Sequence, residues 1–163
     1  MIILGIDPGI AIVGYGVIEA DRGNFKALDY GVITTPKEKS TPERLQMIEK
    51  ALTQLIDRYK PENIALEELF FATNAKTAIT VAEARGVLLL TAINKCGQLY
   101  EYTPLEIKQA ITGYGKADKR QIQTMVKMLL KLKDIPRPDD AADALAVALT
   151  HAQTNRLKGT FRI

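Results

Sequence analysis

Residues that build disulfides and zinc sites are nearly absent from this sequence. Its 163 residues include one cysteine, Cys96, one histidine, His151, and no tryptophan. A single cysteine excludes an intramolecular disulfide, and no CxxC or Cys/His cluster suggests zinc. We interpret Cys96, which lies among apolar neighbours, as a small core residue. His151 has no partner at ligand spacing and receives a similar structural interpretation.

Long hydrophobic runs are also missing. The N-terminal apolar run, Ile2 to Ile6, has five residues and no basic segment before it, which does not fit a signal peptide. No segment approaches the roughly 18–20 apolar residues that are needed to cross a bilayer. The sequence therefore predicts a cytoplasmic protein without a membrane partner.

The composition suggests neither disorder nor a second domain. Hydrophobic residues make up 47% of the chain and charged residues 25%, as is ordinary for a soluble globular protein. A chain of this length can build one sizeable core but hardly two. We therefore expect a single domain over residues 1–163.

The net charge is a mild +3, and its distribution is more informative than its sum. Between residues 108 and 133, one acid, Asp118, stands among basic side chains: Lys108, Lys116, Lys119, Arg120, Lys127, Lys131 and Lys133. Such a stretch fits contact with a polyanion. On composition alone, a solvated helix face explains it equally well.

The hydrophobic pattern predicts an α/β fold. Apolar runs and turn signals predict strands over residues 2–7, 13–19, 27–35, 63–69 and 98–104. Helical spacing predicts helices over 42–59, with Thr41 as N-cap before Pro42, and over 77–95, 105–111, 119–132 and 139–155. Short turns make the first three strands antiparallel, whereas helical crossovers place the fourth and fifth parallel to the first. The result is a mixed five-stranded sheet flanked by helices.

Several carboxylates stand where strand ends or a helix start would hold them rigidly: Asp7, Glu67, Glu68, Asp139, Asp140 and Asp143. Adjacent parallel strands would bring Asp7 beside the fourth strand's end, where sites form in open α/β sheets. Because alternate residues face opposite sides, only one of Glu67 and Glu68 can join Asp7. Both Asp139 and Asp140 share a helix face with Asp143, so spacing does not choose between them.

Four converging acids with no histidine or thiolate ligand need cations to offset their charge. Oxygen ligands of this kind suit Mg²⁺ or Mn²⁺, and two such ions can promote phosphodiester hydrolysis. The basic stretch would then bind a nucleic-acid backbone, and of the pair Phe70–Phe71 we expect only Phe70 to be exposed for stacking. The structural alternative is that Asp139 or Asp140 only caps the helix.

Several motifs together resemble RuvC, the bacterial family of Holliday-junction resolvases. They are GIDPG from Gly5, LEELFFATNAKTA from Leu66, EARGV from Glu83, TPLEIKQAITGYGKADKRQI from Thr103 and DDAADALAVALTH from Asp139. The resemblance covers nearly the whole chain. It implies a ribonuclease H-like fold and a homodimer, for which we expect a surface on the helix from Thr77. It also implies symmetric, Mg²⁺-dependent nicking of four-way junction DNA in recombination and repair, leaving 5′-phosphate and 3′-hydroxyl ends.

The same resemblance assigns roles to individual residues. The family's catalytic, metal-binding acids fall on Asp7, Glu67, Asp140 and Asp143, with Asp7 bridging two Mg²⁺ ions that Mn²⁺ can replace. DNA contacts fall on Phe70, Lys108 and Lys119, and the neighbouring basic residues Lys116 and Arg120 are further candidates. The family works with the RuvA–RuvB branch-migration complex, which is the implied protein partner.

Two other functions fit parts of the pattern. One is a different ribonuclease H-like nuclease that acts on RNA or RNA–DNA hybrids, and the other is a junction-binding module without cleavage. A nucleotide-binding ATPase is disfavoured because no glycine-rich Walker segment with Lys-Ser/Thr follows a strand.

Overall fold

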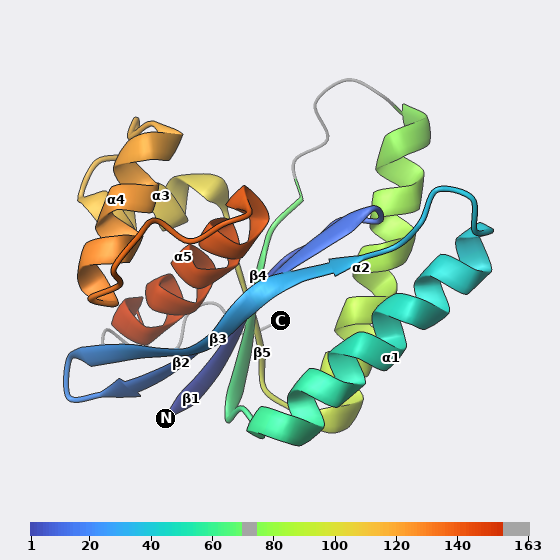
Figure 1. The fold of residues 1–163 in the computed structure, drawn as a ribbon, viewed down its shortest axis with the longest axis horizontal. Helices are drawn as coiled ribbons and strands as arrows, with labels where there is room; N and C mark the ends of the chain where they lie inside the picture. The colour runs from blue at the N-terminus through green and yellow to red at the C-terminus, as the bar shows by residue number, and fades with distance from the viewer. Residues whose placement is uncertain (70–74, 155–163) are drawn as a thin grey trace.

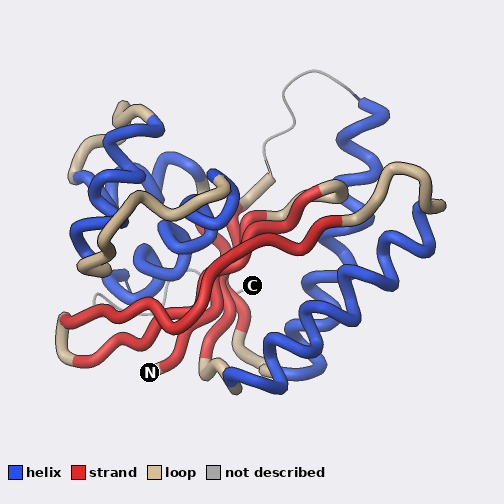
Figure 2. Tube along the Cα trace, viewed as in Figure 1, coloured by secondary structure: helices blue, strands red, loops and turns tan. Residues whose placement is uncertain are grey.

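The computed structural model describes residues 1–69 and 75–154, which form one mixed sheet with helices on both faces (Figures 1 and 2). Within these residues the sheet has five strands in the order β3-β2-β1-β4-β5. Their bounds are β1 Ile2–Asp7, β2 Ile12–Asp21, β3 Asn24–Thr34, β4 Asn63–Glu67 and β5 Leu99–Tyr102. The first three strands are antiparallel, and β4 and β5 run parallel to β1. The predicted sheet is confirmed.

The hairpin between β2 and β3 is longer than its sequence pattern predicts. Its ladder continues to the pair Asp21 and Asn24, so the turn consists of Arg22 and Gly23. Both turn residues have positive φ, 45° and 94°, which is the twist that two-residue hairpin turns need. The exposed polar residues near the turn hide its strand character, because their side chains have no core to face.

Helices α1 (Thr41–Tyr59) and α2 (Ala75–Lys95) cover one face of the sheet, and α3 (Pro104–Thr112), α4 (Lys119–Leu129) and α5 (Asp139–Thr154) cover the other (Figure 1). The predicted N-cap Thr41 is wrong. Ser40 caps α1, because its hydroxyl and backbone N–H both contact the Glu43 carboxylate three residues on. The predicted helix over 119–132 ends earlier, at Leu129, and Lys131 has the left-handed φ of 53°.

The two faces of the sheet contribute to different hydrophobic clusters. Ile3 and Ala65 pack with Leu145 of α5, whereas Leu4 and Ile64 lie on the opposite face, toward α1 and α2. Since side chains alternate along a strand, Asp7 and Glu67 point to the same face as Ile3 and Ala65. That face carries α5.

Glycines on the sheet let α5 lie directly against it. A Cβ atom on Gly14 of β2 would stand 2.0 Å from the carbonyl oxygen of Asp140, and one on Gly5 of β1 would stand 2.1 Å from that of Ala144. Backbone atoms cannot move aside as side chains can. These glycines therefore fix the distance between the strands and the first turns of α5, where Asp140 and Asp143 lie.

The sequence predicts that His151 and Cys96 are both structural residues of the core, and the structure buries them to different degrees. His151 is confirmed as a buried residue, 1% exposed, and its Nδ1 atom lies 2.8 Å from the Tyr102 hydroxyl. Cys96 is only half-buried, and its thiol donates to the Pro61 carbonyl oxygen.

Helix α2 is more apolar than its position in the core requires. By length and composition alone, Lys76–Lys95 could cross a membrane, contrary to our expectation from the sequence. Ala84, Leu88 and Ala92 instead pack in the core, and Arg85 forms an ion pair with Glu101 of β5. Other apolar side chains of α2 face outward: Ile79 and Leu90 are each 62% exposed, and Ile93 is 47% exposed.

Candidate active site

The central parallel strands place two acids side by side. Ile6 of β1 pairs with Leu66 of β4, so the following residues, Asp7 and Glu67, lie next to each other at the carboxyl ends of both strands. Glu68 lies one residue beyond the end of β4, and its charge is not among those that act on Asp7. Which of the two glutamates can join Asp7, left open by spacing alone, is therefore decided by the backbone.

Helix α5 supplies the other two acids. Asp140 and Asp143 lie in its first turns, above the glycines of the sheet, and both contribute a repulsive field at Asp7. The structure therefore brings together the four acids that the family resemblance assigns. Asp139, the extra acid, begins the helix and lies to the side, with its carboxylate in contact with α4.

Proton affinities show how closely the acids interact. Burial, followed by the charges of Glu67, Asp143 and Asp140, raises the pKa of Asp7 to about 8. Burial and the charge of Asp143 raise the pKa of Glu67 to about 7, and burial also raises that of Asp143. Carboxyl groups with affinities near neutral pH are typical of functional sites, where like charges are forced together.

A cleft of about 260 Å³ opens beside these acids. Glu67, Asp143, Lys108 and Lys119 all contribute to its lining. The Lys119 ammonium lies 3.2 Å from Asp143 and 3.4 Å from Asp139, while the charge of Lys108 lowers the pKa of Glu67. The cleft thus combines carboxylates with ammonium groups, which suits a phosphate group bridged to the acids by cations.

The donor set fits divalent cations, although its side chains are not gathered as a finished metal site. Among the described residues, no three acids, histidines or cysteines stand close enough to hold one ion as they are. Lys119 already occupies the position of a counter-cation at Asp143. Carboxylate oxygens without nitrogen or sulfur donors favour Mg²⁺ or Mn²⁺ over softer metals.

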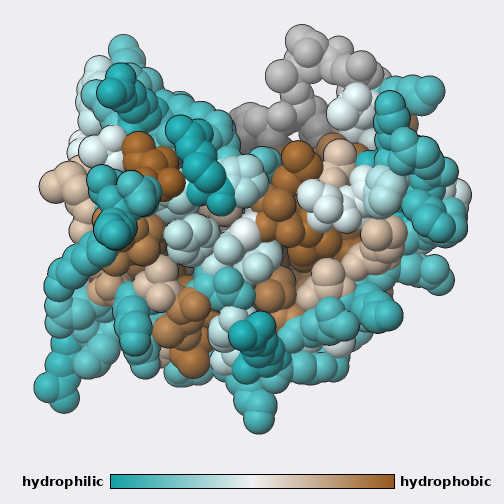
Figure 3. Space-filling view, viewed as in Figure 1, coloured by the Kyte–Doolittle hydropathy of each residue, from teal (hydrophilic) through white to brown (hydrophobic). Residues whose placement is uncertain are grey.

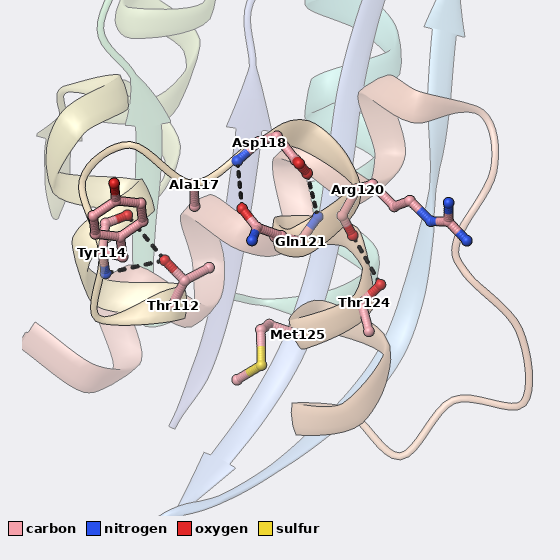
Figure 4. A pocket seen from close by; sticks show the side chains of 8 residues that line it. All are labelled: Thr112, Tyr114, Ala117, Asp118, Arg120, Gln121, Thr124 and Met125. Atoms are coloured by element: carbon pink, nitrogen blue, oxygen red, sulfur yellow. Dashed lines mark hydrogen bonds between the residues drawn. The ribbon is translucent and has the colours of Figure 1, made fainter.

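A larger hollow, of about 430 Å³, adjoins the cleft and shares Ala117 and Asp118 with it. Tyr114 and Thr112 form one side, and Gln121 and Met125 of α4 form the other (Figure 4). The predicted DNA-contacting Arg120 also lines it, but its guanidinium points away from the other labelled side chains (Figure 4). Lys116 is exposed in the loop between α3 and α4 and lines neither space. Phe70 lies outside the described residues.

Sequence reasoning missed the residues that hold the site in place. Asp118 caps α4 by accepting from the Gln121 backbone N–H, and buried Gln123 donates to Asp139. The capping box was readable from the spacing of Asp118 and Gln121. The contact between Gln123 and Asp139 was not, because it joins separate helices.

The mixed sheet, with acids at the carboxyl ends of its central strands, defines a ribonuclease H-like protein. The structure of Thermus thermophilus RuvC superposes with a TM-score of 0.91 at 37% identity, covering 99% of both chains. The T. thermophilus RuvC complex with a Holliday junction substrate gives a TM-score of 0.90 at 35% identity, again over 99% of both chains. The predicted fold class is therefore confirmed.

Sequence comparison identifies the family. Residues 3–151 match the family model for crossover junction endodeoxyribonuclease RuvC. The crossover junction endodeoxyribonuclease RuvC of Alkaliphilus oremlandii is 56% identical over 163 residues, which is 100% of this chain and 99% of the relative. The chain belongs to the RuvC family.

Proposed function

We propose that this protein is a structure-specific endonuclease that resolves Holliday junctions by nicking two strands symmetrically. One observation carries the proposal: Asp7, Glu67, Asp140 and Asp143 converge beside two lysines in a RuvC-family fold. The T. thermophilus relative in complex with a Holliday junction substrate supports the choice of DNA. A role in recombination and DNA repair follows from this activity.

The four acids would hold Mg²⁺, two ions per subunit, and Mn²⁺ could replace it. Bound there, the ions would supply the Lewis acidity for phosphodiester hydrolysis to 5′-phosphate and 3′-hydroxyl ends. Asp7 is the natural shared ligand because the three other acids lie around it. Its high proton affinity means that cation binding must displace a proton near neutral pH.

The lysines act on the substrate instead. Lys108 and Lys119 line the same cleft as Glu67 and Asp143, where their ammonium groups would neutralise and orient the phosphates beside the cut. Phosphate contacts of this kind position the backbone without reading bases. Lys116, Arg120 and Phe70 complete the proposed DNA surface.

We also propose a homodimer formed through α2, because Ile79, Leu90 and Ile93 present an apolar face that this chain leaves exposed. A two-fold dimer would offer one acid cluster to each of two equivalent strands. Figure 3 shows one face of the molecule, on which hydrophobic residues form small separate groups surrounded by hydrophilic residues. We place the dimer in the cytoplasm, working with the RuvA–RuvB complex.

The proposal is tested by cleavage of a mobile four-way DNA junction, with products mapped to the nucleotide. We expect paired nicks at symmetric positions that require Mg²⁺ and religate with DNA ligase. Degradation of an RNA–DNA hybrid with an intact junction would instead make the protein another ribonuclease H-like nuclease. Tight junction binding without nicks would make it a binding module.

A further inference from the structure

Asp139 uses its two carboxylate oxygens for different partners. Oδ1 accepts from Gln123 Nε2 at 3.1 Å and from Arg137 Nη1. Oδ2 lies 3.4 Å from the ammonium of Lys119. Gln123 is 6% exposed on α4, so one oxygen is held by a buried amide while the other remains available to the lysine.

Lys119 lies between Asp139 and Asp143. Its Nζ atom is 3.2 Å from Oδ2 of Asp143, and the two acids stand one helical turn apart on the same face of α5. The two carboxylates have different surroundings. Asp143 lines the cleft together with Glu67, whereas Asp139 is not part of that lining and is held by Gln123 and Arg137. Asp139 thus contacts Lys119 from outside the set of acids that would hold cations.

We propose that Asp139 is a positioning residue for Lys119: it retains the ammonium beside the cleft when Asp143 turns its oxygens to a cation. This inference rests on the proposed function, since it needs Asp143 to serve as a cation ligand. Without Asp139, Lys119 has Asp143 as its remaining anionic partner in the described structure. The lysine would then compete with the cation for that oxygen, and it would lose its fixed position against the phosphate once displaced.

The inference predicts that Asp139 acts through Lys119, which a double-mutant cycle of Asp139→Asn and Lys119→Met can test. Single-turnover junction cleavage is measured across Mg²⁺ concentrations, and Mn²⁺ binding to the DNA-free protein is measured by electron paramagnetic resonance. We expect Asp139→Asn to slow cleavage about 10-fold and weaken Mn²⁺ binding about 3-fold, as exposed ion pairs of this kind are individually modest. Lys119→Met should slow cleavage but tighten Mn²⁺ binding.

In the Lys119→Met background, Asp139→Asn should change each quantity by less than about 2-fold, because the residue it positions is gone. Asp139→Glu, which keeps the charge, should restore part of the loss. Glu68→Gln is the matched control: it removes one charge next to Glu67, from a residue whose charge does not act on Asp7. Its effect on Mn²⁺ binding measures the general loss of negative charge.

Two results would overturn the inference. The first is that Asp139→Asn slows cleavage equally in the unmodified and the Lys119→Met backgrounds. The second is that Asp139→Asn weakens Mn²⁺ binding no more than Glu68→Gln does. If the unmodified protein fails to nick the junction, the proposed function fails instead. The Mn²⁺ titrations of DNA-free protein would still decide whether Asp139 holds Lys119 away from Asp143.

Discussion

Asp7 and Glu67 lie side by side on the adjacent parallel strands β1 and β4, one residue beyond the paired Ile6 and Leu66. Their backbones are fixed by the sheet, so the two carboxylates cannot separate by moving the chain. Burial and the charge of Glu67 raise the pKa of Asp7 to about 8, and burial and the charge of Asp143 raise that of Glu67 to about 7. The fold therefore carries an electrostatic cost in its metal-free form that bound cations would remove.

Replacing Asp7 by Asn should separate activity from stability. We expect Asp7→Asn to reduce junction cleavage by at least about 1,000-fold, since the shared metal ligand is lost, while junction binding changes little. At pH 7 the metal-free variant should be more stable than the unmodified protein by on the order of 2–4 kcal/mol, because a buried carboxyl with a raised pKa is replaced by a neutral group.

Urea denaturation in EDTA and junction binding in Ca²⁺ measure both effects. A destabilised Asp7→Asn protein, or one that no longer binds the junction, would show that Asp7 is a structural residue. Addition of Mg²⁺ should stabilise the unmodified protein and leave the variant unchanged.

The stability of the metal-free protein should fall as pH rises from 6.5 to 8. In this window the folded state retains protons on Asp7 and Glu67 that the unfolded chain has already released, because both folded pKa values are raised. The free energy of unfolding must then decrease with pH, by about 2 kcal/mol across the window for roughly one proton. Asp7→Asn should flatten the curve, and an unmodified protein with a flat curve would contradict the assigned proton affinities.

His151 gives the opposite dependence below this window. Burial lowers its folded pKa from 6.5 to about 4, so its contribution to stability is present above pH 6.5 and is lost as pH falls toward 4. At pH 6.5 folded His151 is already neutral, whereas the unfolded chain still holds about half a proton on it. This residual opposite contribution fades as pH rises toward 8 and is smaller than that of the acids.

The strand order could be predicted because it follows from short-range patterns, whereas the choice of Asp140 over Asp139 came from the resemblance to the RuvC family and not from spacing. Alternation along β1 and β4 allows only one of Glu67 and Glu68 to join Asp7, and the turn lengths decide which strands are parallel. The contacts of Lys119 could not be predicted in this way. Lys119 and Asp139 are separated by twenty positions and begin different helices, so their meeting depends on how α4 and α5 pack.

Two other features of the structure, the N-cap of α1 and the contact of α5 with β2, have signals in the sequence that are too weak or incomplete to predict them. Ser40 stands three residues before Glu43, which is the spacing of a capping box, but Pro42 drew the predicted cap to Thr41. Gly14 and Gly16 alternate along β2, and their spacing marks one face of the strand without saying that a helix lies against it.

The proposed dimer face can be tested by placing a charge on it. Leu90→Glu should convert a dimer into monomers in analytical ultracentrifugation, because a buried unpaired carboxylate would cost several kcal/mol at an interface. Junction cleavage should then yield unpaired single nicks. Met128→Glu on α4 is the matched control, since Met128 is 63% exposed and Leu90 is 62% exposed. A dimer that survives Leu90→Glu would place the two-fold interface elsewhere.

Gly14→Ala should damage the active site from beneath. The new Cβ would stand 2.0 Å from the Asp140 carbonyl oxygen and 2.6 Å from its carbonyl carbon, so the start of α5 must lift off the sheet. We expect a loss of about 1–3 kcal/mol in the free energy of unfolding and a fall of about 100-fold in single-turnover cleavage, because a shift of about 1 Å is enough to misplace a catalytic group.

Gly31→Ala provides the comparison for this substitution. Its Cβ would also be crowded, 2.9 Å from an atom, but that atom is the hydroxyl at the end of the Tyr15 side chain, which can rotate away. This variant should retain cleavage within about 3-fold, since neither α5 nor an acid has to move. If both alanine variants lose cleavage equally, the strand glycines are needed for the structure of the sheet and not for the position of α5. If neither does, close contact between β2 and α5 does not determine the position of Asp140.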